Sequence, residues 1–276
     1  MDDMSYHESG ALSADEPLCR YEGSERWYRG PERALDVPYV ACVGGDETFG
    51  RFVARPFPSV LDNKLDTPCV NLGSLFCGVD GLTLDSGLQD LMNNATACVL
   101  QLPGLLGQTN PFYRVHTRRN DRVLAATADL RALYPEVDFA EIHFVRHLIL
   151  RLAEFQDARF EMVADTLRRG WLTALSDFLT RIRPPVVLLW LDMVHSPDAQ
   201  HLSLPESVRV TASMVAELAR NCAGKVEMRV RPAGESDDLE DMLFGTMQQP
   251  MAEYMIGPAT HRAIAERLLS AIRDLD

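Results

Sequence analysis

Short apolar runs alternate along this chain with segments whose apolar residues recur at helical spacing. Five runs are rich in apolar residues. The first four are nearly continuous, which is typical of strands buried on both faces of a sheet, and the fifth is weaker. The five runs are Tyr39–Val43, Cys69–Leu72, Ala97–Leu102, Pro185–Leu191 and Val226–Val230. Helical segments between strands predict a parallel sheet with right-handed crossovers and helices on both faces.

The helical segments differ in length. Arg51–Ala54 predicts the start of a helix that Pro56 and Pro58 interrupt, ending near Leu65. Asp85 predicts the N-cap of a helix that runs through Met92, and residues 205–221 and 259–273 predict two more helices. Between the third and fourth strands, apolar residues keep helix spacing from 139 to 182. They are Ile142, Val145, Leu148, Ile149, Leu152, Phe160, Val163, Leu167, Trp171, Leu175 and Phe178.

The predicted organisation is one α/β domain with additions. Residues 1–35 are polar and lack periodicity, which predicts an N-terminal arm. Residues 36–276 predict a three-layer α/β/α sandwich with a five-stranded parallel sheet of flavodoxin-like order. A helical insertion covers about 121–182 and offers a face for a homodimer. A chain of 276 residues with 46% apolar residues suits one large domain.

Charge and composition exclude several classes. The formal net charge is −13 and the basic residues are scattered, so nucleic acid is not an expected partner. Apolar runs are too short to span a bilayer, and the acidic N-terminus does not resemble a signal peptide, so a cytoplasmic protein without a membrane partner is expected. The six cysteines form no C-x-x-C pair, so neither a metal nor another cofactor is expected.

Candidate chemistry lies after the strands, because ligands of doubly wound sheets bind at the carboxyl ends of the strands. The glycine turn 44–50 follows the first strand and places Asp46 at a helix entry. The candidate residues are, in chain order, Gly45, Asp46, Gly73, Ser74, Asn110, Tyr113, Arg118, Arg119, Asp192, His195 and His261.

These residues resemble a known family. Gly-x-x-x-Thr-x-Gly at 44–50 is similar to the first block of the GDSL/SGNH hydrolases, and Gly73 resembles the glycine of their second block. The stretch from Gly107 to Asn110 is similar to their third block, and His261 resembles their catalytic histidine. The sequence segments 44–53, 70–73 and 112–122 resemble most closely an uncharacterised bacterial family of that fold.

The resemblance implies a hydrolase that acts on acyl groups of a small polar, sugar-like substrate. Asp46 stands where the family has its nucleophilic serine, and Pro258 stands where it has the aspartate that orients the histidine. His261 would be the base. Gly45, Gly73 and Asn110 would line the oxyanion pocket. Ser74 is a substitute nucleophile.

Several alternatives remain open at this stage. Asp46 suits a nucleophile, a base, a polar ligand contact or a helix cap, and a helix N-terminus would favour its anionic form. Tyr113, Arg118 and Arg119 suit either substrate binding or surface pairing. Asp192 and His195 are candidates for acid–base support. A helical spacing relates His143, Arg146 and His147, and we interpret them as residues that pack and form ion pairs rather than as a metal site. A non-catalytic ligand-binding pseudo-hydrolase and an oligomeric scaffold are the alternative functions.

Overall fold

The computed structural model describes residues 18–155 and 158–275, and the side chains of 200–202 also lie outside the description. The N-terminal half of the predicted arm, residues 1–17, therefore lies outside the described residues. Five strands form the central sheet: β3 (Val40–Gly44), β4 (Cys69–Gly73), β5 (Ala97–Gln101), β8 (Val186–Met193) and β9 (Gly224–Val230). All their pairings are parallel, in the order β4-β3-β5-β8-β9. The predicted fold class is confirmed.

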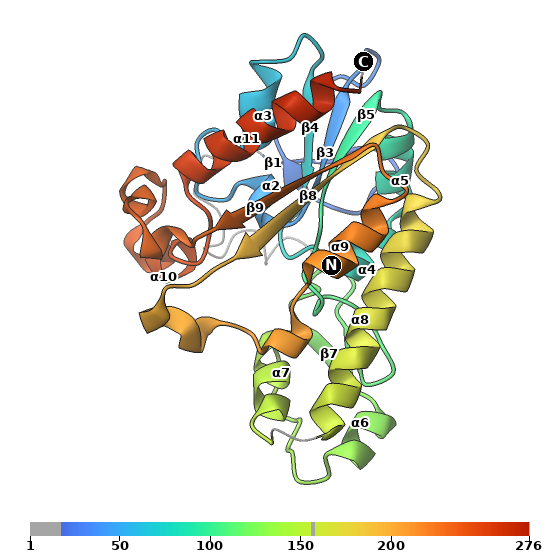
Figure 1. Ribbon diagram of the computed structural model, residues 1–276, viewed down its shortest axis with the longest axis vertical. Coiled ribbons are helices and arrows are strands. Elements are labelled where there is room, and N and C mark those ends of the chain that lie inside the picture. Colours follow the sequence, from blue (N-terminus) through green and yellow to red (C-terminus); the bar gives the residue numbers. More distant parts are fainter. Residues whose placement is uncertain (1–17, 156–157, 276) are drawn as a thin grey trace, which may run out of the picture.

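Helices cover both faces of this sheet, as continuously apolar strands require (Figure 1). One face packs on α5 (Ser86–Asn93), the upper half of α8 (Ala158–Leu179) and α9 (Ala212–Ala219). The other face packs on α3 (Phe57–Asp62) and α11 (Pro258–Arg273). Alternation along β3 divides the two cores, because Ala41 and Val43 face the first group of helices while Val40 and Cys42 face the second.

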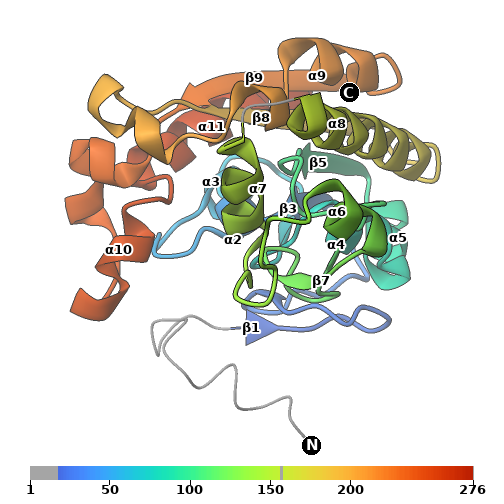
Figure 2. The ribbon, with the colours of Figure 1, turned by 90° about the horizontal axis from the view of Figure 1, so that it is seen from below.

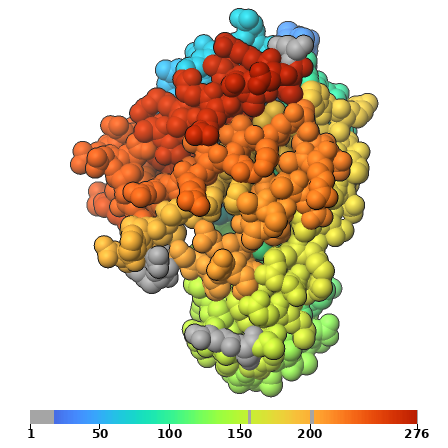
Figure 3. Space-filling model, viewed as in Figure 1, coloured from blue at the N-terminus to red at the C-terminus, as the bar shows by residue number. Residues whose placement is uncertain are grey.

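The chain between β5 and β8 forms a lobe below the carboxyl edge of the sheet. It contains β6 (Tyr113–Val115), β7 (Val123–Ala126), α6 (Ala128–Leu133), α7 (Val145–Ala153) and the lower half of α8. The lobe has its own apolar core, and Figure 3 shows it projecting from the body. The long helix α8 ties the two together, because Phe160 and Val163 belong to the core of the lobe while Trp171 and Phe178 belong to that of the sheet.

The helix after β3 differs from the sequence expectation. α2 comprises only Asp46–Phe49, and Arg51–Ala54 is not helical. Gly50 has φ +72° and ends the helix in the left-handed conformation, which a glycine adopts without steric cost. The prediction of a helix start at Arg51 was wrong because Gly50 acts as the C-cap of an earlier helix. Helix formation resumes at Phe57, with Pro58 in the first turn of α3.

The remaining elements are short. Asp85 caps α5 through the Leu88 N–H at 3.0 Å, so that prediction is confirmed. The helix expected over 205–221 is shorter, because the hydroxyl of Thr211 caps α9 and a 3-10 turn, η2 (Glu206–Val208), precedes it. The other elements are β1 (Leu18–Cys19), β2 (Tyr28–Arg29), α4 (Val79–Thr83), η1 (Pro197–Leu202), η3 (Ala233–Glu235), η4 (Asp237–Asp241), η5 (Thr246–Gln248) and α10 (Gln249–Ala252).

Two general properties of the described chain bear on function. The helices of residues 18–155 and 158–275 are all too short or too polar to cross a membrane. The six cysteines are free thiols, five of them buried.

The lobe lies close to the carboxyl edge of the sheet. Figure 2, seen from below, shows α7 in front of the sheet edge at which α2 begins.

Candidate functional site around Asp46

Helix α2 is held at the carboxyl edge of the sheet by the strands on either side of β3. A Cβ on Gly73 would lie 2.2 Å from the backbone nitrogen of Phe49, so only glycine lets β4 approach α2 this closely. On the other side, Gln101 at the end of β5 accepts hydrogen bonds from the Thr48 N–H at 3.0 Å and the Thr48 hydroxyl at 2.6 Å. The same amide donates to Glu47 at 2.6 Å. α2 is therefore rigidly placed despite its length.

Asp46 is the first residue of α2, and its side chain turns away from the helix toward the loop after β4. Gly45 is the N-cap, so the predicted capping role for Asp46 is wrong. Its Oδ2 accepts the N–H of Phe76 at 3.0 Å. Phe76 has φ +58°, an uncommon conformation for a residue with a Cβ. Oδ1 is inaccessible to water and has no hydrogen-bond partner among the described residues.

The surroundings of Asp46 favour its neutral form. Burial, with a smaller contribution from the neighbouring Glu47 carboxylate, raises the pKa of this carboxyl group from 3.8 to about 7. The Phe76 N–H and the Arg51 guanidinium oppose the shift without cancelling it. The sequence expectation that the helix N-terminus would favour the anion was therefore wrong. Loss of water outweighs the field of a four-residue helix.

Asp46 lines a cavity of about 580 Å³ between the sheet edge and the lobe. This volume lies in the range of small-molecule sites. Its walls come from the loops after β3, β4 and β5, from the β6–β7 loop, and from the first turns of α7. The lining residues are Asp46, Phe76, Cys77, Gly78, Leu106, Gly107, Asn120, Asp121, Phe144, Val145, Arg146, His147 and Leu150. The cavity is therefore mostly apolar with a few polar groups.

One wall of this cavity is a rigid hydrogen-bonded unit. Asn120 is fully buried, and its Oδ1 accepts the N–H groups of Gly78 and Gly81 at 2.8 and 2.9 Å. Its amide nitrogen donates to the His116 carbonyl at 3.0 Å. A Cβ on Gly78 would lie 2.6 Å from Gly107, so two glycines bring the loops after β4 and β5 into contact. Asn120 thus joins three loops behind the cavity.

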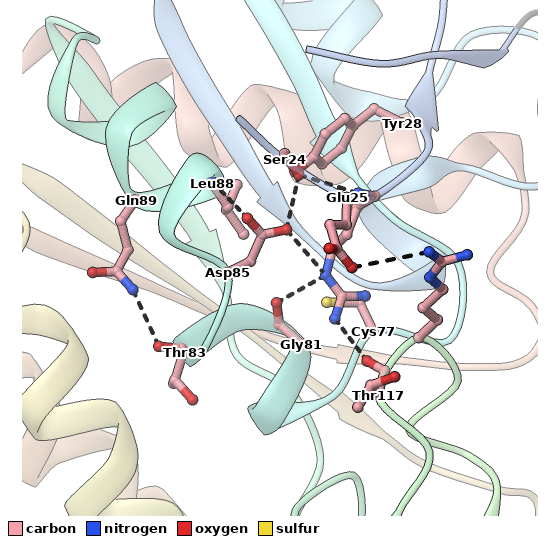
Figure 4. Close-up of polar contacts among 12 residues, drawn as sticks. Ser24, Glu25, Tyr28, Cys77, Gly81, Thr83, Asp85, Leu88, Gln89 and Thr117 are labelled. Carbon is pink, nitrogen blue, oxygen red and sulfur yellow. Dashed lines mark hydrogen bonds and ion pairs between the residues drawn. The ribbon is translucent and has the colours of Figure 1, made fainter. Parts of the chain in front are cut away.

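Residues 20–29 reinforce this wall from outside (Figure 4). Arg26 donates to the Gly81 carbonyl at 2.9 Å and lies 3.6 Å from the carboxylate of Asp85. Ser24 donates to Asp85 at 2.8 Å and shares a 2.6 Å hydrogen bond with the buried Tyr28 hydroxyl. Cys77, which lines the cavity, lies beside this network in Figure 4. Burial raises the pKa of its thiol to about 11, so it is not an activated nucleophile.

His261 lies elsewhere, within the contact between α11 and α3. It is buried, with 1% of its surface exposed, and is not among the described residues that line the cavity. Its Nδ1 accepts the N–H of Phe57 at 3.1 Å and its ring stacks on that of Phe57. Burial, with a smaller contribution from the charge of Arg29, lowers the pKa of His261 to about 3. A neutral ring with an accepting Nδ1 carries its proton on Nε2, which leaves no nitrogen to act as the predicted base.

The predicted oxyanion donors are engaged internally. The Gly73 N–H donates to the side chain of Asn71 at 2.9 Å. The amide nitrogen of Asn110 donates to the Gln108 carbonyl at 3.1 Å, and its Oδ1 accepts the N–H groups of Phe112 and Tyr113. Both residues therefore shape turns, and neither is a described lining residue of the cavity. Gly45 is the α2 N-cap, close to the carbonyl of Cys77.

The other candidates near the β6–β7 loop divide between core and surface. The Tyr113 side chain is buried and donates to the Leu106 carbonyl at 2.9 Å, and burial raises its pKa. Arg118 is half exposed and lies 4.0 Å from Glu25. Arg119 donates two hydrogen bonds to the Asp121 carboxylate, from Nε at 3.2 Å and from Nη2 at 2.9 Å. Its guanidinium carbon lies 3.9 Å from the centroid of the Phe76 ring. Ser74 is buried at the end of β4, outside the cavity lining of the described chain.

Asp192 lies at the end of β8 and His195 follows that strand, and both form ion pairs of their own. Asp192 lies 3.1 Å from Arg209 and 3.6 Å from Arg229. His195 Nδ1 lies 2.6 Å from Glu235, whose pKa is lowered first by the N–H of Ser196 and also by His195. Neither residue is among the described residues that line the Asp46 cavity. The structure therefore places the predicted acid–base support in a separate cluster.

Sequence reasoning missed the groups that come to Asp46 from the lobe. Arg146 and His147 were interpreted as packing and pairing residues, but both line the cavity. Asn120 was noted only as part of the polar run 118–122, and Phe76 was not selected. A signal existed for Arg146 and His147, because basic side chains in the first turn of a helix oppose its dipole. Among the described residues, no three His, Cys, Asp or Glu side chains gather as a metal site requires.

Comparison with known proteins gives one family and distant structures. A family model described as a domain of unknown function (DUF6473) matches residues 4–276. No curated protein matches the sequence. A crystal structure of a protein from Lactobacillus plantarum is 14% identical and has a TM-score of 0.42, covering 86% of this chain and 97% of that one. The lipase Lip_vut3 from a goat rumen metagenome is 9% identical with a TM-score of 0.42, over 85% and 97% of the two chains.

Proposed function

The chain belongs to the family DUF6473, and we propose that it is a hydrolase-like protein that binds a small molecule against Asp46. The proposal depends above all on one observation. Asp46 Oδ1 is buried, has no hydrogen-bond partner in the described chain, and belongs to a residue that lines a 580 Å³ cavity. A buried polar atom without a partner is costly, and a ligand that donates a hydrogen bond would remove that cost.

The same carboxyl group suits acid–base catalysis. With a pKa of about 7, Asp46 is present in both protonation states at neutral pH, as a general acid or base requires. In ester hydrolysis the carboxylate takes a proton from water as the water oxygen bonds to the acyl carbon. The carboxylic acid then returns a proton to the leaving oxygen as the ester bond breaks. The Phe76 N–H holds Oδ2, so Oδ1 is the oxygen left for proton exchange, which requires the side chain to turn Oδ1 toward the cavity.

The substrate class follows from the resemblance to SGNH hydrolases, with Asp46 in place of the serine. We propose acyl esters of small polar molecules such as sugars. A serine-type mechanism through His261 is not part of the proposal, because Phe57 occupies the accepting nitrogen of that histidine. The homodimer through the insertion stays a prediction, with Leu124 and Met162 as its exposed apolar side chains.

A non-catalytic binding protein is the second candidate. It is favoured by the internal hydrogen bonds of Gly73 and Asn110, which remove the donors expected to stabilise an oxyanion. The cavity and the unpartnered oxygen of Asp46 suit a binding protein as well as they suit an enzyme.

Ester hydrolysis by purified variants separates these candidates. Acetylated sugars and p-nitrophenyl esters are the probes, with Asp46→Asn as the test variant. Asp129→Asn is the matched control, because Asp129 also lies in the first turn of a helix but is exposed. An acid–base role predicts that Asp46→Asn alone loses about 10²-fold or more in turnover. Sugar binding without turnover, weakened in Asp46→Asn, supports the binding protein. Equal turnover and binding in all three proteins overturns both.

A further inference from the structure

Two basic side chains line the same cavity as Asp46. Arg146 and His147 are the second and third residues of α7, and both line the cavity. Phe144, the N-cap, has a side chain that cannot accept a hydrogen bond from the helix, and the first turn contains no acidic residue. The first turn of α7 and its two basic side chains therefore border the same cavity, where the helix dipole and the basic groups favour an anion.

The acidic groups of the lining do not cancel this charge. Asp121 is held by the fork of Arg119, with distances of 3.2 and 2.9 Å. Asp46 is partly protonated at neutral pH because burial raises its pKa to about 7. Partial burial lowers the pKa of Arg146, as expected for a guanidinium group whose hydration is reduced.

Most of the remaining cavity lining is apolar. The side chains of Phe76, Leu106, Phe144 and Leu150 contribute to the walls. A ligand that fills the cavity therefore needs an apolar body between its polar ends. The cavity volume of about 580 Å³ suits a molecule of the size of a substituted aromatic acid or a short acyl compound.

We propose that the ligand of the Asp46 cavity is a small organic anion whose carboxylate or phosphate group binds Arg146 and His147, and whose hydrogen-bond donor binds the Asp46 carboxyl group. This inference rests on the proposed function for the position of the site and extends it to the ligand class. Carboxylates and phosphates share the required chemistry, because both accept paired hydrogen bonds from a guanidinium group.

Four probes test the two ends of this ligand by isothermal titration calorimetry. 4-Hydroxyphenylacetate has both groups, 4-hydroxyphenylacetamide lacks the charge, and 4-methoxyphenylacetate lacks the donor. 4-Hydroxybenzylphosphonate replaces the carboxylate with a phosphate-like group. The test variants are Arg146→Gln, the double variant Arg146→Gln/His147→Gln, and Asp46→Asn. Arg151→Gln is the matched control, because Arg151 lies on α7 but pairs with Glu154 away from the described cavity lining.

The wild type and Arg151→Gln should bind the acid at least about tenfold more tightly than the amide, the scale of one charge-assisted hydrogen bond. Arg146→Gln should reduce this preference, and the double variant should abolish it. The wild type should bind the methoxy compound more weakly than the hydroxy acid. Asp46→Asn should bind these two compounds equally. The relative affinities of the carboxylate and the phosphonate then identify which anion the site prefers.

Three results would overturn the inference: equal binding of acid and amide, a preference that survives the double variant, or no binding of any probe at millimolar concentration. Its failure can be told apart from that of the proposed function. Cleavage of neutral esters that depends on Asp46, without any preference for anions, supports the function and rejects the ligand class. A preference for anions that depends on Arg146, without cleavage of any ester, supports the ligand class and rejects catalysis.

Discussion

Asp46 and His261 both lie in the first turn of a helix and have a buried ionisable side-chain atom, yet their surroundings differ in one decisive respect. His261 has its accepting nitrogen bonded to the Phe57 N–H and its ring packed on Phe57. Asp46 has one oxygen bonded to Phe76 and a second oxygen with no partner in the described structure, and it lines a cavity. Burial shifts the pKa of both groups toward the neutral form. The unpartnered atom beside a cavity distinguishes a candidate site from a satisfied core residue.

The largest expected effect is an opposite pH dependence of the two groups. The folded pKa of His261 lies near 3, below the ordinary 6.5, so the unfolded chain binds the proton between these values. Its contribution to stability is present above pH 6.5 and is lost as pH falls, by up to about 5 kcal/mol. The folded pKa of Asp46 lies near 7, above the ordinary 3.8. Its contribution is present below pH 3.8 and is lost as pH rises through 7, by up to about 4 kcal/mol.

Urea unfolding of wild type, Asp46→Asn and His261→Gln across this pH range measures both contributions. Relative to wild type, Asp46→Asn should become more stable as pH rises, and His261→Gln should become more stable as pH falls. Parallel profiles for all three proteins would contradict the account of both sites.

Truncation of each side chain to alanine at pH 7 should also distinguish the two residues. The expected difference in the free energy of unfolding is smaller than the pH-dependent changes. His261→Ala removes a packed ring and leaves the buried Phe57 N–H without its acceptor. We expect a loss of about 3 kcal/mol in the free energy of unfolding. Asp46→Ala should cost about 1 kcal/mol or less, because loss of the Phe76 hydrogen bond is offset by removal of a buried carboxyl group. Equal losses measured by urea unfolding would show that Asp46 is as well satisfied as His261.

The smallest expected effect concerns Arg118 and Arg119 in the loop beside the cavity. Arg119→Gln should cost about 1 kcal/mol, since this side chain holds Asp121 and stacks on Phe76. Arg118→Gln should cost about 0.3 kcal/mol or less, because its ion pair with Glu25 is exposed and 4.0 Å long. Thermal unfolding of the two variants compares them directly, and the reverse order would contradict the assignment of Arg119 to the cavity wall.

The sheet was predictable because its signal is local. Strands buried on both faces read as continuous apolar runs, such as 97–101 and 186–190, and the spacing between them imposes parallel order. Asp85 was predictable as a cap for the same reason. The helix at α2 was misplaced because Gly50 can either lead into a helix or end one, and only its left-handed conformation decides between them.

The site was less predictable because its properties depend on distant residues. The position of Asp46 followed from the glycine turn, but its partner Phe76 lies 30 residues away. The position of His261 in the first turn of α11 was expected, whereas the Phe57 N–H that occupies it lies 204 residues earlier. Arg146 and His147 reach the cavity only because the lobe folds back below the sheet edge. Neither the local sequence pattern nor the family resemblance predicts any of these long-range contacts.

The ionisation of Asp46 tests the central claim most directly. Carbon-13 NMR of the side-chain carboxyl groups, with Asp46→Asn to assign the signal, follows this group alone as the pH is changed. We predict a midpoint near pH 7 for Asp46. A midpoint at or below the ordinary 3.8 would mean that water or another partner satisfies the carboxylate, and would contradict its role as the unpartnered group of a ligand site.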